Sequence, residues 1–444
     1  MADVKDAGLV EVQPEPAAVA AEVPPAIAAQ TLGQYLRAWS VRIRSGDSGV
    51  LPVVLGLVII SVVFELISPR NAFFLPENLV NLFQQSAVFM VLAMAEIFVL
   101  LLGEIDLSLG YVGACGAVVT VQLVQGVTTN WPWWGAIIVG LLFCAVFGAL
   151  QGTIISRLHV PSFVVTLAGF LIANGLMLIL LLLGPFSGYI TLVSSQPNAN
   201  VLRNLMFGNI DPTISWIVLA IVVALLGGWF LYRDLNRRRS GLVVPPFSLV
   251  VIRILLMAGV GVAVVAICDV DRSHSLLIHV VGVPAVIPIV LGVLVVWTVL
   301  LQRTRFGRYV YAVGGNAEAA RRAGVSLPRI RTLCFMLCSM TGGIGMILYA
   351  SYLGGMSNNV NGGQLVLFAV AAAVIGGTSL FGGRGKAMHG VLGGLVIGGI
   401  YNGMGLIGLQ VQAEFIVTGF VLIAAVSIDA LSRRAASAGS AARV

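Results

Sequence analysis

The chain has 444 residues, of which 59% are hydrophobic and only 10% are charged, and its mean hydropathy is +1.01. These values exclude an ordinary soluble domain and predict an all-α, polytopic membrane protein, in which 52 glycines allow helices to approach one another closely. In such a protein a net charge of +7 mostly reflects membrane topology and says little about nucleic acid.

The composition of the N-terminal segment is not the one expected of a secretory signal. Residues 1–30 are rich in Ala, Pro, Val and Glu and are expected to be a disordered tail. In residues 31–49, apolar side chains recur at helical spacing while Arg37, Arg42 and Arg44 occupy other faces. That pattern is typical of an amphipathic helix lying along the inner membrane surface.

Residues 50–431 form the predicted transmembrane domain. Apolar stretches near the roughly 20 residues needed to span a bilayer follow in succession. They lie near 50–67, 80–102, 106–126, 133–155, 161–183, 213–232, 248–268, 284–301, 332–353, 364–381, 391–407 and 412–431. Twelve crossings would place both termini, including the tail at 432–444, on one side.

The basic residues test that topology. With both termini in the cytoplasm, 21 Lys and Arg residues fall on inner segments and only Arg70, Arg203 and Arg272 on outer ones, with Arg253 near the inner end of a crossing. This asymmetry strongly favours the cytoplasm for both termini.

Residues 101–119, LLGEIDLSLGYVGACGAVV, place Glu104, Asp106 and Ser108 between two apolar runs. GEID leaves little room for a turn between full crossings, so one or both helices are expected to be broken there. Charges at membrane depth usually face a cavity or a partner. The alternative is that Asp106 and Ser108 cap the following helix, which does not exclude a functional role.

Other polar residues lie within the predicted crossings. Hydrogen bonding between helices is the default role of the amides and hydroxyls. Glu96 stands apart, because a carboxylate inside an apolar crossing should face the interior of the bundle, as a pathway residue or in a structural pair. The remaining residues of this kind are Gln151, Thr166, Asn174, Asn402 and Glu414.

Residues 303–331 form a basic loop that contains seven of the chain's Lys and Arg residues and lies in the cytoplasm by the charge count. Residues 316–323 are predicted to be a short helix capped by Asn316. A positive-inside loop is the simple interpretation, but the capped helix and flanking glycines suggest a surface for a soluble partner.

Residues 374–396, VIGGTSLFGGRGKAMHGVLGGLV, have a layout related to that of 101–119: an apolar helix ends in glycine, a short segment with Thr378 and Ser379 follows, and a glycine-rich helix begins. We expect the two stretches to be equivalent elements of a degenerate internal repeat, like the interrupted helices of transporters.

The chain carries no signature of an enzyme or a metal site. The five cysteines fall within apolar runs and are expected to be small buried side chains, and the four histidines are dispersed without metal-ligand spacing. The sequence contains no P-loop, so ATP is not expected to bind to this chain in the P-loop manner.

Four ordered motifs resemble the permease subunits of bacterial sugar ABC importers of the ribose and xylose type. They are GEIDLSLG at 103–110, VPSFVVTLAG at 160–169, FGRYVYAVGGNAEAARRAG at 306–324 and AAAVIGGTSLFGGRG at 371–385. The chain looks most similar to the xylose branch, because it carries an extra hairpin at 233–301.

The resemblance implies that the loop at 303–331 holds a coupling helix that docks into a separate ATPase subunit, where ATP and Mg²⁺ would bind. The matching coupling residues are Gly314, Gly315, Asn316, Glu318, Ala319, Ala320, Arg321 and Gly324. Candidates for the translocation pathway are Glu96, Asp106, Ser108, Thr166, Asn174, Thr378, Ser379 and Asn402. One departure is that Val366, Leu367 and Phe368 stand where family members often carry Glu-Leu-Asp.

The expected function is the permease subunit of an ATP-driven importer of xylose or a similar monosaccharide. It would be a homodimer in the lipid of the bacterial inner membrane, with an extracytoplasmic sugar-binding protein meeting chiefly residues 184–211. Two alternatives remain: an ion-coupled carrier of the major-facilitator kind, and a membrane sensor or scaffold that recruits a cytoplasmic regulator.

Overall fold

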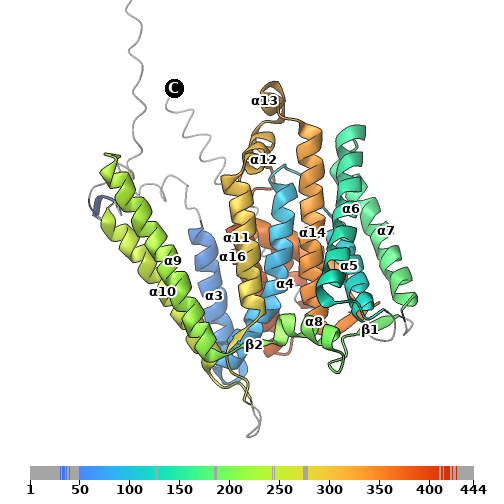
Figure 1. Cartoon of the computed structure of the whole chain (residues 1–444), viewed down its shortest axis with the longest axis horizontal. Helices are drawn as coiled ribbons and strands as arrows, with labels where there is room; N and C mark the ends of the chain where they lie inside the picture. Colours follow the sequence, from blue (N-terminus) through green and yellow to red (C-terminus); the bar gives the residue numbers. More distant parts are fainter. Residues whose placement is uncertain are drawn as a thin grey trace, which may run out of the picture. The chain divides into compact units, whose positions relative to one another are not determined.

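A computed structural model represents the whole chain (Figure 1). It describes residues 50–125, 129–184, 188–242, 244, 246–273 and 279–409, with isolated residues within 31–40 and 412–427. The predictions for the N-terminal tail, most of the interfacial helix at 31–49, Glu414, half of the crossing at 412–431 and the C-terminal tail lie outside the described residues.

Every crossing predicted between residues 50 and 407 coincides with a helix. These helices are α3 (Leu51–Ile67), α4 (Pro76–Leu100), α5 (Leu109–Val124), α6 (Trp133–Leu158), α7 (Ser162–Leu182), α9 (Pro212–Arg239), α10 (Phe247–Asp269), α11 (Val286–Arg303), α14 (Leu327–Leu353), α15 (Gly362–Ile375) and α16 (Ala387–Leu406). Seven of the described helices are long and apolar enough to cross a membrane: α4, α6, α7, α9, α10, α11 and α14. A polytopic helical membrane protein is therefore confirmed, while the number of twelve crossings stays a prediction.

Two helices are shorter than predicted. Helix α5 has 16 residues and α15 has 14, so they span about 24 and 21 Å, less than the roughly 30 Å of the hydrocarbon core. Helix α4, by contrast, continues without a break for 25 residues. The expected interruption at GEID therefore falls in the connection before α5, and the segments 101–108 and 376–386 replace the missing helical turns.

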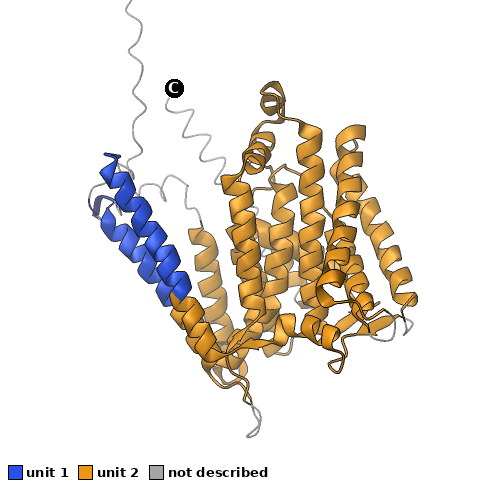
Figure 2. Ribbon diagram, viewed as in Figure 1, with its two compact units in different colours: residues 1–45, 221–259 blue, residues 46–220, 260–444 orange. Residues whose placement is uncertain are grey.

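The chain forms two compact units (Figure 2). Unit 1 comprises residues 1–45 and 221–259, and unit 2 comprises residues 46–220 and 260–444. In unit 1, the Arg253 guanidinium lies 5.7 Å from the centroid of the Phe230 ring. The extra hairpin predicted at 233–301 contributes residues to both units, because its first part belongs to unit 1.

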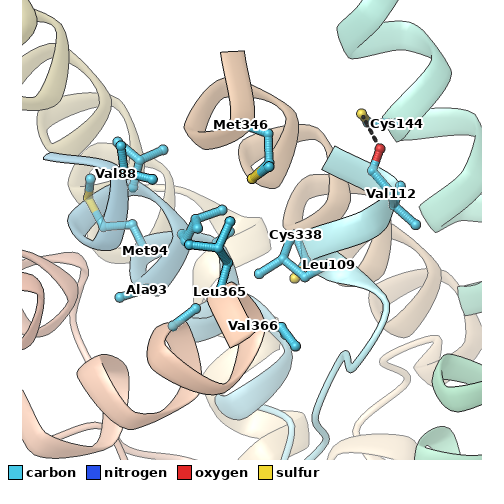
Figure 3. Packing of buried hydrophobic residues seen from close by; sticks show 14 of the residues in the cluster. Val88, Ala93, Met94, Leu109, Val112, Cys144, Cys338, Met346, Leu365 and Val366 are labelled. Carbon is cyan, nitrogen blue, oxygen red and sulfur yellow. Dashed lines mark hydrogen bonds between the residues drawn. The ribbon is translucent and has the colours of Figure 1, made fainter. Parts of the chain in front are cut away.

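The core of unit 2 is built around α4. Residues 86–100 of this helix are buried on every side, as expected of a helix that is apolar all round. Helices α14, α15 and α16 pack against it, and α14 also packs against α5 and α6. Figure 3 shows side chains from these helices together, with Val88 and Met94 of α4, Leu365 and Val366 of α15, and Cys338 and Met346 of α14.

The packing of α16 on α4 depends on small residues. A Cβ atom placed on Gly394 would lie 2.6 Å from the Cα of Met90, and one on Gly390 would lie 2.7 Å from the backbone nitrogen of Met94. No side chain fits at these distances. The two backbones therefore approach as closely as they do only because α16 presents glycine to α4.

The two ends of unit 2 differ. At one end α11 leads into α12 (Arg305–Gly315) and α13 (Ala317–Arg322). The opposite end carries α8 (Pro197–Phe207) and two small antiparallel pairs, β1 (Tyr189–Thr191) with β4 (Gly355–Ser357) and β2 (Asn209–Ile210) with β3 (Val283–Pro284) (Figure 1). Residues 184–211, predicted to meet a binding protein, contribute β1, α8 and β2, with 185–187 outside the described residues.

Replacing Gly394 by alanine should destabilise the protein by about 1–3 kcal/mol, because the added methyl group overlaps the α4 backbone. A Cβ atom on Gly399 of the same helix would have no atom within 4 Å, so Gly399→Ala is the matched control. Thermal unfolding of purified protein in detergent checks this. Equal melting temperatures for the two variants would contradict the packing argument.

Candidate functional site

Three segments that are distant in sequence meet at the α13 end of unit 2: the α4–α5 connection (101–108), α12 with α13, and the α15–α16 connection (376–386). The Gly383 amide donates a hydrogen bond to the Leu101 carbonyl at 2.9 Å, and the Tyr311 hydroxyl donates to the Gly385 carbonyl at 2.7 Å. Main-chain and side-chain hydrogen bonds thus join the three segments.

Gly314 lies where the three segments converge. A Cβ atom on this residue would lie 1.7 Å from the Leu101 carbonyl oxygen and 2.8 Å from the Gly383 amide nitrogen. The end of α12 can therefore contact both connections only with glycine at this position. The neighbouring Gly315 differs, because its Cβ position has no atom of the described residues within 4 Å. The fold requires glycine at position 314, whereas the open space beside Gly315 would admit a side chain.

The predicted capped helix is confirmed as α13. The Asn316 side chain accepts a hydrogen bond from the Ala319 amide at 2.9 Å, which satisfies a free amide of the first turn. Ala320 is buried and anchors the helix, and Gly324 adopts a left-handed conformation with φ of +84° just after it. These contacts place Ala319 and the exposed remainder of α13 on a short, well-defined helix.

The exposed face of α13 carries a cluster of three charges. Glu318 pairs with Arg321 at 2.9 Å and with Arg322 at 3.1 Å. Hydrogen bonds from both arginines lower the pKa of Glu318, so its carboxylate stays ionised at neutral pH. The helix therefore presents one carboxylate and two guanidinium groups, a net charge of +1, to the surroundings.

A further ion pair links the first segment to α14. Arg331 Nε lies 3.0 Å from Glu104 Oε1, and both side chains are largely shielded from solvent. Because Arg331 follows α13 by nine positions and Glu104 belongs to the α4–α5 connection, the pair gives a second link between them. No periodic signal in the sequence indicates this pair, since the two residues lie far apart in the chain.

The α4–α5 connection is organised by two buried carboxylates. Glu96 Oε1 accepts a hydrogen bond from the Asp106 amide at 3.1 Å, and Cys338 donates to Glu96 Oε2 at 3.5 Å. Asp106 Oδ1 accepts from both the amide and the hydroxyl of Ser108, at 2.9 and 2.6 Å. Each carboxylate thus holds non-helical backbone or a neighbouring helix in place.

The capping interpretation is wrong for Ser108, whereas Asp106 does accept the Ser108 amide at the start of α5. Ser108 occupies the N-cap position of α5, but its side chain accepts no hydrogen bond from the helix. Its hydroxyl instead donates to Asp106, forming a charge-assisted hydrogen bond to a carboxylate two residues away. The hydroxyl oxygen also lies 3.0 Å from the Gln151 side-chain amide on α6, which joins this cluster to a third helix.

The remaining candidates are divided among several places. Thr166 is buried beside the cluster, with its hydroxyl 3.4 Å from the Ile105 carbonyl, whereas Asn174 is half-buried farther along α7. Thr378 and Ser379 belong to the α15–α16 connection, where Thr378 contacts His389 and Ser379 accepts from the Phe381 amide at 3.0 Å. The two connections touch each other through the Gly383–Leu101 hydrogen bond, while the internal repeat stays a prediction.

Asn402 lies at the opposite end of unit 2. Its side chain forms a reciprocal pair of hydrogen bonds with Asn78 of α4, at 2.9 and 3.0 Å. Asn402 lines one of two adjoining cavities of about 130 and 390 Å³, both bordered by Gln85, Tyr352 and Tyr401. Sequence reasoning missed these cavities, although Asn78, Asn81 and Gln85 follow one another at helical spacing and so share a face of α4.

The departure at Val366, Leu367 and Phe368 also falls near this end. Val366 and Phe368 are buried and Leu367 is exposed, and Phe368 borders the smaller cavity. Apolar side chains therefore take the place expected for carboxylates.

Comparisons with known proteins agree on one family. Residues 78–426 match the family of branched-chain amino acid transport system permease components. The xylose transport system permease protein of Escherichia coli strain K12 is 31% identical over 382 residues, covering 86% of this chain and 92% of the relative. The D-allose transport system permease protein of that strain is 27% identical over 84% of this chain and 90% of the relative.

The ribose import permease protein of the same strain is 25% identical and covers 89% of this chain and 95% of the relative. No solved structure matches the chain. The matched region contains the three converging segments, both buried carboxylates and both cavities. The chain belongs to the family of branched-chain amino acid transport system permease components.

Proposed function

We propose that the chain is the membrane-spanning subunit of an ATP-driven sugar importer, with xylose or a similar monosaccharide as its cargo. It acts as a homodimer in the bacterial inner membrane, with an ATPase subunit on the α13 side and a sugar-binding protein on the α8 side. The functions of the relatives, which transport xylose, allose and ribose, support the sugar class. They do not support the carrier or the scaffold alternative.

One observation carries the coupling proposal: an exposed, capped helix is packed directly onto the interior of the bundle. Through Gly314, α12 and α13 contact the α4–α5 and α15–α16 connections, whose residues Asp106 and Thr378 are buried. A displacement of α13 by a bound ATPase therefore reaches the connections without passing through a flexible linker. We propose that this movement alternates the access of the bundle.

The proposal also gives a role to each charged group on α13. Glu318 holds Arg321 and Arg322 in defined positions, so their guanidinium groups are presented to a partner without a large further loss of side-chain entropy. Two arginines fixed in this way suit an acidic groove on the ATPase. ATP and Mg²⁺ would be bound by that subunit.

The whole proposal is tested by reconstitution into proteoliposomes with candidate ATPase and sugar-binding proteins. We expect uptake of labelled xylose, allose or ribose that requires ATP and both partners, because this chain carries no P-loop. Omitting the ATPase is the control. Uptake that continued without it under an ion gradient would contradict the proposal, as would the absence of sugar uptake under all conditions.

Docking is tested at Gly315. Gly315→Leu should leave the melting temperature unchanged, because the Cβ position is open, yet weaken binding of the ATPase about tenfold or more by occupying the docking surface. Gly56→Leu on α3 also enters open space and is the matched control. Co-purification and titration of the ATPase measure the effect. Undiminished binding by Gly315→Leu would place the docking surface elsewhere.

Two substitutions of Glu96 distinguish a role in the translocation pathway from a structural role. Glutamine keeps an oxygen for the Asp106 amide, so we expect Glu96→Gln to fold and transport nearly as the wild type does. Glu96→Ala leaves that amide without a partner and should cost about 1–3 kcal/mol of stability. Melting curves and uptake rates are compared for both variants. A stable Glu96→Gln protein without transport would instead assign Glu96 to the pathway.

A further inference from the structure

The two adjoining cavities lie at the end of unit 2 that is far from α13. Their walls come mainly from the first halves of α4 and α15 and from the last turns of α14 and α16, with further residues from the segments just before α15 and just after α16. Helix α14 starts beside α13 and has 27 residues, so Tyr349 and Tyr352 at its other end are roughly 35 Å away along the helix. In the proposed orientation this is the side on which the binding protein delivers its cargo.

The described residues that line the two cavities carry no charge. Amide side chains, tyrosines and apolar residues line both cavities, and no Asp, Glu, Lys, Arg or His is among the described residues that border either one. A site without charge is suited to a neutral ligand and not to an ion or an amino acid. The mixture of aromatic surface with a few polar groups is typical of small-molecule sites.

Gln85 is the central polar residue, because it borders both cavities. Its Nε2 group donates to Asn81 Oδ1 at 3.3 Å and to the Tyr352 hydroxyl at 3.1 Å. Both amide hydrogens are thus used, while the Oε1 atom is buried and has no hydrogen-bond partner among the described residues. A buried acceptor without a donor is costly, and a bound molecule whose hydroxyl donates to this oxygen, once the Gln85 side chain turns toward the cavity, would remove that cost.

Aromatic rings form the apolar part of the walls. Phe89 packs edge to face against Tyr401 and Phe368, with ring centroids 5.8 and 5.7 Å apart. Tyr352 stacks on Phe207 of α8, with centroids 6.1 Å apart. These contacts hold the rings in fixed orientations, which preserves the shape of the cavities and offers flat apolar surface beside the amides.

We propose that the two cavities form one entry site for a neutral, polyhydroxylated ligand, namely a monosaccharide, in which Gln85 Oε1 accepts a sugar hydroxyl and the tyrosine rings contact its C–H face. The inference rests on the proposed function only for the choice of sugar as cargo. It places a sugar-binding site on the permease itself, in addition to the site on the binding protein. Tyr352 and Gln85 are its specificity-determining residues.

Binding is measured without transport. The permease–ATPase complex is placed in nanodiscs without the binding protein, and saturation-transfer NMR is recorded with millimolar D-xylose, D-allose or D-ribose. We expect transfer to at least one sugar from the wild type. In Gln85→Met the apparent Kd should rise about tenfold or more, and in Tyr352→Phe about threefold, because each variant removes a polar group and keeps the side-chain volume.

Gln84→Met is the matched control, because Gln84 is the neighbouring amide on α4 but donates to the Met206 carbonyl of α8 and borders neither cavity. Sugar binding should be unchanged in it. The absence of saturation transfer from a wild type that imports sugar in proteoliposomes would overturn the entry site and leave the proposed function standing. Equal weakening in Gln84→Met and Gln85→Met would also overturn it. Failure of the wild type to import any sugar would instead reject the proposed function.

Discussion

The rest of unit 2 depends on one constraint, which is that non-helical backbone at membrane depth must be enclosed by protein. In hydrocarbon an unpaired amide or carbonyl costs several kcal/mol. The α4–α5 and α15–α16 connections meet this requirement by covering each other, with Gly383 donating to Leu101 and Gly314 packed against both. Glu96 and Asp106 complete the arrangement by accepting hydrogen bonds from the α4–α5 backbone itself.

This enclosure also explains how α5 and α15 can be shorter than the hydrocarbon core without exposing polar backbone to lipid. Helices α5 and α15 would leave polar backbone exposed to lipid if they stood alone. Here α12 contacts the two connections that adjoin these helices, so the soluble-facing segment and the membrane interior are parts of one packed structure. A partner that moves α13 must displace buried backbone hydrogen bonds or carry the connections with it. The second course preserves the hydrogen bonds and is therefore the response that costs less free energy.

Local features of the sequence predicted much of this. The Asn316 cap of α13, the helices between residues 50 and 407 and the interruption at GEID all arise from neighbouring residues, so periodicity and capping chemistry could reveal them. The ion pair between Glu104 and Arg331 could not be foreseen, because it joins residues that only the fold brings together. The role of Ser108 could not be foreseen for a related reason, since Asp106 is visible in the sequence but the orientation of the Ser108 hydroxyl toward it is not.

The cavities depend both on features visible in the local sequence and on contacts that only the fold brings together. The spacing of the amides of α4 in the sequence shows that they share one helix face. Tyr352 and Tyr401, by contrast, lie near Gln85 only because α14 and α16 pack on α4. That packing relies on Gly390 and Gly394, the same glycines that place α16 against the core. Close helix approach thus determines both the stability of the bundle and the shape of the cavities.

The hydrogen bonds already present in the walls limit how tightly a sugar can be held. The amide groups bond to one another, as Asn78 does to Asn402, and this leaves few groups free for a ligand. A site with few free polar groups binds weakly. Weak binding is what release toward the α13 side requires, because a tightly held sugar would remain at the entrance when the bundle changes its access.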